Sequence, residues 1–95
     1  MSHIIEYSPD AEDHLRAQTA RQRTIVLDGV DEQLNNQPTV KTRNRKPMRP
    51  DSRSPWGLRI GTLRVYYDVV EESKPMGCVR AIGIKERDQV RIGGR

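Results

Sequence analysis

The stretch from Trp56 to Val70, WGLRIGTLRVYYDVV, constrains the fold most strongly because it is the longest run of β-favouring residues in the chain. Gly61 and Thr62 interrupt this run, and a glycine at the first of two central turn positions suits a type II′ β-turn. The stretch therefore predicts an antiparallel hairpin made of two strands, Trp56–Ile60 and Leu63–Val70.

The two predicted strands carry arginines among apolar neighbours. Successive side chains of a strand point to opposite faces of the sheet, so Arg64 and Tyr66 share one face. Arg59 adds a second cation on the neighbouring strand. Cationic side chains on a sheet surface indicate a binding or catalytic face. The expected faces of the second strand are Leu63, Val65, Tyr67 and Val69 on one side, and Arg64, Tyr66, Asp68 and Val70 on the other.

The residues before residue 39 predict one strand and two helices. His3–Tyr7 is a short β-favouring run typical of an edge strand. Ser8-Pro9 has the residues of a helix N-cap and first helical position, and this helix is expected to end near Thr19. Thr19 and Gln22 have the spacing of a capping box that opens a second helix, which Asn35–Pro38 ends. The apolar positions of the second helix are Ile25, Val26, Leu27, Val30 and Leu34.

After the hairpin, the pattern predicts a polar turn at Glu71–Gly77 and a further strand at Cys78–Ile84. Lys85–Asp88 is expected to form a short helical turn and Val90–Ile92 a last extended piece. The predicted fold is therefore a single α+β domain over residues 1–95: an N-terminal strand, a helical hairpin and an antiparallel meander, with both helices on one sheet face. In the last long strand, Val79, Ala81 and Gly83 are expected to alternate against Cys78, Arg80, Ile82 and Ile84.

Charge is distributed unevenly along the chain. Residues 1–40 hold three basic and seven acidic side chains, residues 41–53 hold six and one, and residues 54–95 hold eight and five. Such a polarised molecule can bind a polyanion with its basic side. Residues 39–55, with three prolines and six basic side chains, predict a loop. This loop is either a solvated connector or an arm that contacts phosphates.

Composition excludes several classes of protein. A chain of 95 residues fits one domain. Cys78 is the only cysteine, so we expect neither an intramolecular disulfide nor a cysteine metal cluster, and no cofactor. No apolar run approaches the roughly 20 residues that span a bilayer, and the N-terminus lacks a signal-type charged region, so we expect a cytoplasmic protein. His14 is expected to be an exposed helix histidine.

Three motifs, WGLRIG at 56–61, LRVYYDV at 63–69 and AIGIKER at 81–87, follow the predicted strand-helix-helix start. Together, over nearly the whole chain, they resemble the RelE/ParE superfamily of toxins from type II toxin–antitoxin systems. The resemblance implies a compact α+β fold with a concave basic sheet, and a cognate antitoxin whose C-terminal segment wraps the toxin. In the RelE branch the sheet binds mRNA in the ribosomal A site and promotes its cleavage; in the ParE branch the target is DNA gyrase.

The resemblance also implies roles for individual residues. Arg64 matches the superfamily arginine that contacts the scissile phosphate. Lys85 matches a basic position in the late motif, and Arg59 falls close to a basic position of the RelE branch. Two departures bear on catalysis more than on binding: Gly57 stands where mRNA-cleaving members have another lysine, and Arg91 stands where they have a tyrosine near the C-terminus.

RNA cleavage without a metal needs the 2′-hydroxyl deprotonated, the phosphorane charge stabilised and the leaving 5′-oxygen protonated. Arginine suits the second task because its planar fork holds two phosphate oxygens, but it stays protonated and is a poor base. A lysine crowded by other cations can lose its proton, so Lys85 is the candidate general base, or else a solvated surface lysine. The expected catalytic residues are Arg64, Lys85 and Arg59, and the expected RNA-binding residues are Arg43, Arg45, Lys46, Arg49, Tyr66, Arg87 and Arg91.

Three functions remain open on the sequence alone. The first is a RelE-like ribosome-dependent mRNA endonuclease, a metal-independent endoribonuclease that inhibits translation, which Arg59, Arg64 and Lys85 favour. The second is a ParE-like DNA gyrase inhibitor. The third is a catalytically degraded protein that retains only antitoxin binding.

Overall fold

The Trp56–Val70 stretch folds into the predicted hairpin. In the computed structural model, β3 (Trp56–Ile60) pairs antiparallel with β4 (Leu63–Val70), and only Gly61 and Thr62 separate the two strands. Gly61 has a φ of 59°, as the first central residue of a type II′ turn requires. The structure describes residues 4–34, 43, 45–48, 54–70 and 76–92.

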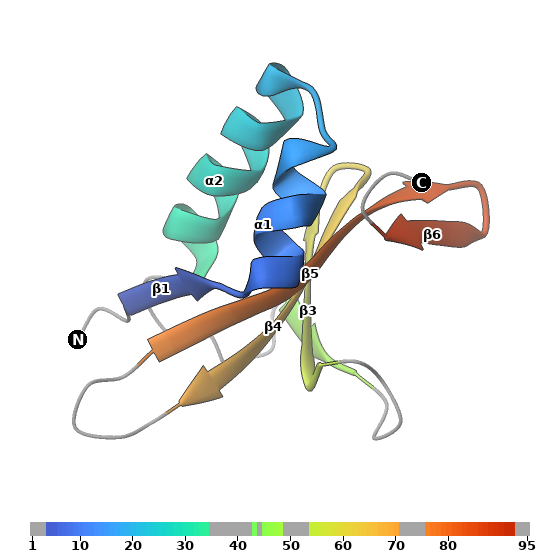
Figure 1. Cartoon of the computed structure of the whole chain (residues 1–95). Helices are drawn as coiled ribbons and strands as arrows, with labels where there is room; N and C mark the ends of the chain where they lie inside the picture. Colours follow the sequence, from blue (N-terminus) through green and yellow to red (C-terminus); the bar gives the residue numbers. More distant parts are fainter. Residues whose placement is uncertain (1–3, 35–42, 44, 49–53, 71–75, 93–95) are drawn as a thin grey trace.

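The hairpin lies inside a six-stranded sheet (Figure 1). The strand order is β1-β5-β4-β3-β2, and β6 also pairs with β5. β1 runs parallel to β5, whereas the other strand pairs are antiparallel. The predicted meander of β3, β4 and β5 is confirmed. The remaining strands are β1 (Ile4–Tyr7), β2 (Arg45–Pro47), β5 (Met76–Glu86) and β6 (Gln89–Ile92).

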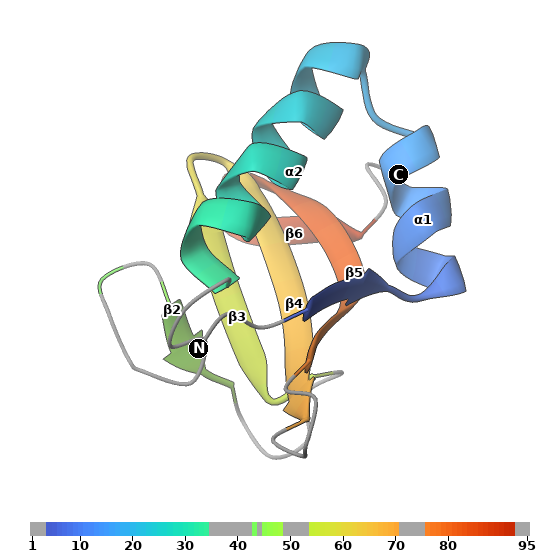
Figure 2. The same cartoon turned by 90° about the vertical axis from the view of Figure 1, so that its left-hand side faces the viewer.

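Two helices, α1 (Pro9–Arg16) and α2 (Ala20–Leu34), pack on one face of this sheet (Figures 1 and 2). Ser8 caps α1 as predicted, because its Oγ accepts a hydrogen bond from the Ala11 N–H at 3.1 Å. The capping box of α2 also forms. The Thr19 N–H donates to Gln22 Oε1 at 3.0 Å, and the Gln22 N–H donates to Thr19 Oγ1 at 3.1 Å. The α+β architecture is thus as predicted.

The hydrophobic core fills the space between the helices and the sheet. Val26, Val30 and Leu34 of α2 are fully buried, because positions four apart lie on the same side of a helix. Ile25 and Leu27, the other two apolar positions of this helix, are each 40% exposed. The core side of β4 is Leu63, Val65, Tyr67 and Val69, as its alternation predicts.

A β-bulge in β5 reverses the alternation predicted for that strand. Tyr66 lies opposite Ala81, but the next residue, Tyr67, lies opposite Val79, so Arg80 is an extra residue. An extra residue shifts every later side chain to the other face. The prediction for β5 is therefore wrong beyond the bulge: the side chains that pack on the core are Val79, Ile82 and Ile84.

Two local predictions need correction. The expected helical turn at Lys85–Asp88 is absent, because β5 continues to Glu86 and turns back into β6 through Arg87, whose φ is 55°. The expected loop at 39–55 contains the short strand β2. The predicted turn at Glu71–Gly77 is wrong for its last two residues, because β5 begins at Met76. Residues 71–75 of this turn, the expected helix end at 35–38 and the loop residues 39–42, 44 and 49–53 lie outside the described residues. In the described part of the chain, no helix is long and apolar enough to cross a membrane.

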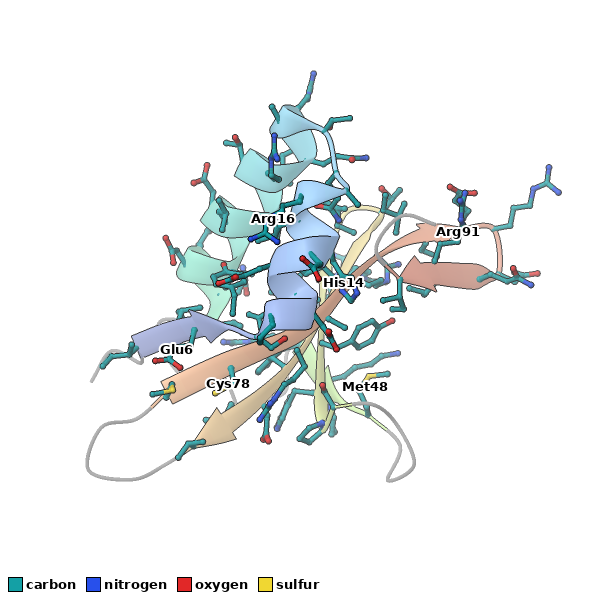
Figure 3. The ribbon with its side chains drawn as sticks, viewed as in Figure 1. Glu6, His14, Arg16, Met48, Cys78 and Arg91 are labelled. Carbon is teal, nitrogen blue, oxygen red and sulfur yellow. The ribbon has the colours of Figure 1, made fainter. Side chains whose placement is uncertain are left out.

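The side chains of Ser8, the N-cap of α1, and of His14 within α1 cover a gap along one edge of β5. β1 pairs with Met76–Val79 on this edge and β6 with Gly83–Glu86. Between them, the Ser8 hydroxyl donates to the Arg80 carbonyl oxygen at 3.1 Å. The Ile82 N–H donates to His14 Nδ1, also at 3.1 Å (Figure 3). The expectation that His14 is exposed is therefore wrong, because its ring is half-buried against the bulged strand.

Candidate nucleic-acid interface

A cavity of about 300 Å³ lies on the sheet face that the helices leave open. Five of its lining side chains are cationic and one is a carboxylate, so its field attracts anions. Six of the predicted site residues come together here: Arg43, Lys46, Arg59, Arg64, Tyr66 and Lys85. The other described residues that line it are Met48, Gly57, Leu58, Asp88 and Val90.

Arg59 and Arg64 form the centre of this site. They are direct cross-strand partners of β3 and β4, and both line the cavity. The Nη1 group of Arg64 donates to the carbonyl oxygen of Gly61 at 2.7 Å and to that of Leu63 at 2.9 Å. Arg59 Nη2 donates to the carbonyl oxygen of Arg43 at 3.3 Å. Backbone carbonyls thus hold both guanidinium groups near the hairpin turn.

The electrostatics of the pair are unfavourable without an anion. Burial lowers the pKa of Arg64, and the positive charge of Arg59 lowers it further, against an opposing effect of Tyr66. Burial raises the pKa of Tyr66, while Arg64 pulls it down. Like charges directly across a strand pair repel each other. A bound phosphate would relieve this repulsion and use the donors that the pair presents.

Lys85 reaches the same cavity because the end of β5 is tied to the hairpin turn. The Lys85 N–H donates to the Thr62 carbonyl oxygen at 2.7 Å. The β5–β6 turn then brings Asp88 to the cavity wall, and Val90 lies across from Lys85. The sequence did not indicate Asp88, because the segment was expected to be helical. Within the described residues, no group of three His, Cys, Asp or Glu side chains is placed to hold a metal ion.

Lys46 stands beside Gly57, the position where the family pattern has another lysine. Lys46 and Gly57 are cross-strand partners of β2 and β3, and both line the cavity. A Cβ atom at residue 57 would lie 2.7 Å from Met48 Sδ, so the absence of a side chain leaves room for this methionine. Lys46 therefore supplies, from the neighbouring strand, a cation close to the place that Gly57 leaves empty.

Arg45 does not reach this face. It lies opposite Leu58, whose side chain belongs to the core, and only 8% of its own surface is exposed. Its Nη1 group donates to the Gln33 carbonyl oxygen at 2.7 Å. This bond satisfies one of the last carbonyl groups of α2, which have no partner within the helix. Arg45 thus joins β2 to α2 on the helix side of the sheet.

Arg91, on the β5–β6 hairpin (Figure 3), does not line this cavity. It lies opposite Ile84, which packs on the core side of β5, and its Nη1 donates to Glu86 Oε1 at 3.1 Å. Arg87 lies in the β5–β6 turn and lines a separate hollow with Glu86 and Arg91. Arg49 lies outside the described residues.

The two aromatic residues next to the hairpin arginines have different surroundings. Tyr66 is half-buried and lines the cavity, where its ring can stack on a base. Trp56 stacks on Tyr67 instead, with ring centroids 6.3 Å apart and an interplanar angle of 22°. Both rings lie on the core side of the hairpin. Tyr66 is therefore the aromatic residue that the described part of the cavity offers to a ligand.

A mixed sheet with two helices on one face defines an α+β fold. The same fold occurs in a chain of the toxin–antitoxin complex RelBE2 from Mycobacterium tuberculosis, whose crystal structure matches with a TM-score of 0.73. The match covers 90% of this chain and 100% of that chain, at 19% sequence identity. No protein-family model matches the chain, and no curated protein matches it. The structural likeness shows that the chain has a RelE-like fold.

Proposed function

We propose that this chain is the toxin of a type II toxin–antitoxin system and acts in the cytoplasm as a RelE-like, ribosome-dependent mRNA endonuclease. The observation that carries the proposal is the convergence of Arg59, Arg64, Lys85 and Tyr66 on one open sheet face. The RelBE2 structure is that of a toxin–antitoxin complex, which supports a cognate antitoxin as the partner of this chain. Cleavage of mRNA would block translation and arrest growth.

In the proposed reaction, the arginine pair holds the scissile phosphate. Arg64 and Arg59 stabilise the negative charge that develops on the phosphorane, which is the task that preformed guanidinium groups do best. Lys46 adds a phosphate contact on the β2 side, and Tyr66 stacks on a neighbouring base.

The proton of the attacking 2′-hydroxyl passes to a group on the cavity wall. Two candidates line it: the Lys85 amine, which must first lose its own proton, and the Asp88 carboxylate, which accepts a proton directly. The 2′-oxygen attacks phosphorus and the P–O5′ bond breaks, which leaves a 2′,3′-cyclic phosphate on one fragment. The leaving 5′-oxygen becomes a 5′-hydroxyl by taking a proton from the Lys85 ammonium, either the one that Lys85 carries while Asp88 acts as base or the one that Lys85 has just accepted. No oxidant or other co-reactant is required.

Inducible expression of the wild-type chain and of an Arg64→Gln variant tests this function. We expect the wild type to arrest growth and primer extension to show cuts within codons, and we expect both effects to disappear in Arg64→Gln. Arg21→Gln, on an exposed position of α2, is the matched control and should behave as the wild type. Growth arrest with intact mRNA, together with inhibition of purified DNA gyrase in a supercoiling assay, would contradict the mRNA endonuclease function and support a ParE-like gyrase inhibitor.

The antitoxin partner can be tested with the same strains. A type II antitoxin is a protein that neutralises its toxin by binding it, and its gene is expected next to that of the toxin. Co-expression of the adjacent small protein should restore growth and yield a complex that co-purifies with this chain. If no neighbouring product restores growth, the toxin–antitoxin assignment is wrong.

A further inference from the structure

A second cavity, of about 500 Å³, continues the open face of β4 beyond Tyr66. Asp68, which lines it, lies two residues after Tyr66 on the same side of the strand, roughly 7 Å further along. The two cavities therefore lie next to each other along one strand. The second is lined by Ser8, Asp10, Ser54, Pro55, Asp68 and Arg80.

The chemistry of the second cavity differs from that of the first. It combines two carboxylates with one guanidinium and two hydroxyls, so it lacks the cationic excess that attracts phosphate. Among the described residues, no ion pair joins Arg80 to Asp10 or Asp68. The Arg80 guanidinium, the Asp10 carboxylate and the second carboxylate oxygen of Asp68 are thus available to a ligand that presents both donors and acceptors, whereas Asp68 Oδ1 accepts from the Val69 N–H.

Ser54 gives this cavity an unsatisfied buried group. Its side chain is 2% exposed, and its Oγ has no hydrogen-bond partner among the described residues. A buried hydroxyl without a partner costs free energy, which a bound ligand with a matching polar atom can recover. Arg80 is presented here by the β5 bulge, whose backbone is fixed by the Ser8 hydroxyl. Bulges commonly re-aim a side chain beside a functional site.

We propose that this cavity binds a guanine base of the same RNA strand whose phosphate occupies the Arg59–Arg64 site. Guanine presents the adjacent N1–H and N2–H donors, which suit the Asp68 carboxylate, and the O6 and N7 acceptors, which suit a guanidinium such as that of Arg80. The cationic cavity would then position the backbone, and the mixed cavity would read the base. The inference rests on the proposed function, because it places a base of the proposed RNA substrate.

Nuclear magnetic resonance titration of the ¹⁵N-labelled full chain tests the guanine site. The probes are the 2′-O-methylated trinucleotides UGU and UAU, which the 2′-hydroxyl mechanism cannot cleave. We expect UGU to shift the amide signals of Arg59 and Arg64 and also those of Asp68 and Arg80. We expect UAU to shift only the first pair and to bind about ten-fold more weakly.

The Asp68→Asn variant should lose the preference for UGU while binding UAU as the wild type does. The asparagine keeps an oxygen that can accept from the Val69 N–H, as Asp68 Oδ1 does at 2.7 Å, so the strand is expected to remain intact. Asp13→Asn, on the exposed side of α1, is the matched control. Equal affinity of the wild type for UGU and UAU, or an unchanged preference in Asp68→Asn, would overturn the guanine site alone. If neither probe shifts the Arg59 and Arg64 signals, the RNA-binding function and the guanine site both fall.

Discussion

Arg59 and Arg64 lie directly opposite each other on β3 and β4, with both guanidinium groups beside one cavity. Burial and the neighbouring charge of Arg59 both lower the pKa of Arg64, so the pair stores unfavourable electrostatic energy. Like charges directly opposite each other destabilise a strand pair. Because a bound anion would relieve this repulsion, the pair favours anion binding at this face of the sheet.

The first prediction concerns the effect of the repulsion between Arg59 and Arg64 on the stability of the ligand-free protein. Arg59→Gln should leave the melting temperature of the ligand-free protein equal to or above that of the wild type, because it removes the repulsion. Pyrophosphate at constant ionic strength should raise the melting temperature of the wild type and should have little effect on Arg59→Gln or Arg64→Gln. Differential scanning fluorimetry measures both effects. An equal rise in all three proteins would show that the anion binds elsewhere.

The second prediction distinguishes the structural role of Arg45 from the binding role of Lys46, its neighbour on β2. Arg45→Met should lower the free energy of unfolding by about 1.5–3 kcal/mol, because the bond from a charged group to the Gln33 carbonyl is lost. The free energy of unfolding of Lys46→Met should stay within about 0.5 kcal/mol of that of the wild type, since Lys46 is exposed. The same variant should nevertheless weaken growth arrest. Urea unfolding gives the free energies. If Lys46→Met destabilised the protein more than Arg45→Met does, the placement of Arg45 on the helix side and Lys46 on the open side of the sheet would be wrong.

The third prediction concerns the contact between α1 and the β5 bulge. His14→Ala removes the acceptor of the Ile82 N–H and should cost about 1–3 kcal/mol. His14→Gln retains an acceptor oxygen and should recover part of this loss. Hydrogen exchange of the Ile82 amide is the specific readout, because it should accelerate in His14→Ala more than in His14→Gln. Equal protection of this amide in all three proteins would show that the bond contributes nothing.

The fourth prediction concerns alkaline pH. Burial raises the pKa of Tyr67 to about 12, although the positive charge of Arg45 opposes this shift. The folded state thus holds the phenol proton more tightly than the unfolded state does. This contribution to stability is fully present below pH 10, the usual pKa of tyrosine, and is lost as the pH rises towards 12. Tyr67→Phe should reduce the fall in the free energy of unfolding above pH 10. Urea unfolding followed by Trp56 fluorescence measures this free energy. An unchanged slope would contradict this account.

The fifth prediction assigns the proton acceptor of the proposed reaction. If Asp88 accepts the proton, Asp88→Asn should lower the cleavage rate by about 10²–10⁴-fold, the usual contribution of a general base. Lys85→Met would then act mainly through weaker mRNA binding, with a higher KM. The opposite pattern would assign the role to Lys85. Multiple-turnover cleavage on programmed ribosomes, measured as kcat and KM against pH, distinguishes the two. If neither variant slows cleavage, both assignments fail.

The sequence predicted those parts of the fold that depend on local signals. The N-cap at Ser8, the capping box at Thr19 and the turn at Gly61 each act over a few residues, and all three are present. The alternation in β4 was correct because no irregularity interrupts it. The resemblance over the hairpin and the AIGIKER motif gave the fold that the match to the RelBE2 structure shows.

The errors arose where distant segments decide the local structure. The bulge at Arg80 is set by the pairing of β5 with β4 and by the Ser8 side chain, neither of which is visible in the sequence of β5. The face of Arg45 depends on a strand of three residues inside a segment that reads as a loop. Arg91 lies opposite Ile84 in β6, a pairing that depends on the β5–β6 turn and is not visible where a helical turn is expected. The cavity at Asp68 and Arg80 joins segments from four parts of the chain, so no motif indicates it.

Purified ribosomes provide the assay for the role of the arginine pair on the open sheet face in mRNA cleavage. The protein is added to ribosomes that hold a defined mRNA with an empty A site, and the 5′ ends of the fragments are mapped by primer extension. We expect cuts within the A-site codon for the wild type and for Arg21→Gln, no cuts for Arg64→Gln, and none on mRNA without ribosomes. Intact mRNA with the wild-type protein, or unchanged cleavage by Arg64→Gln, would contradict this role of the arginine pair.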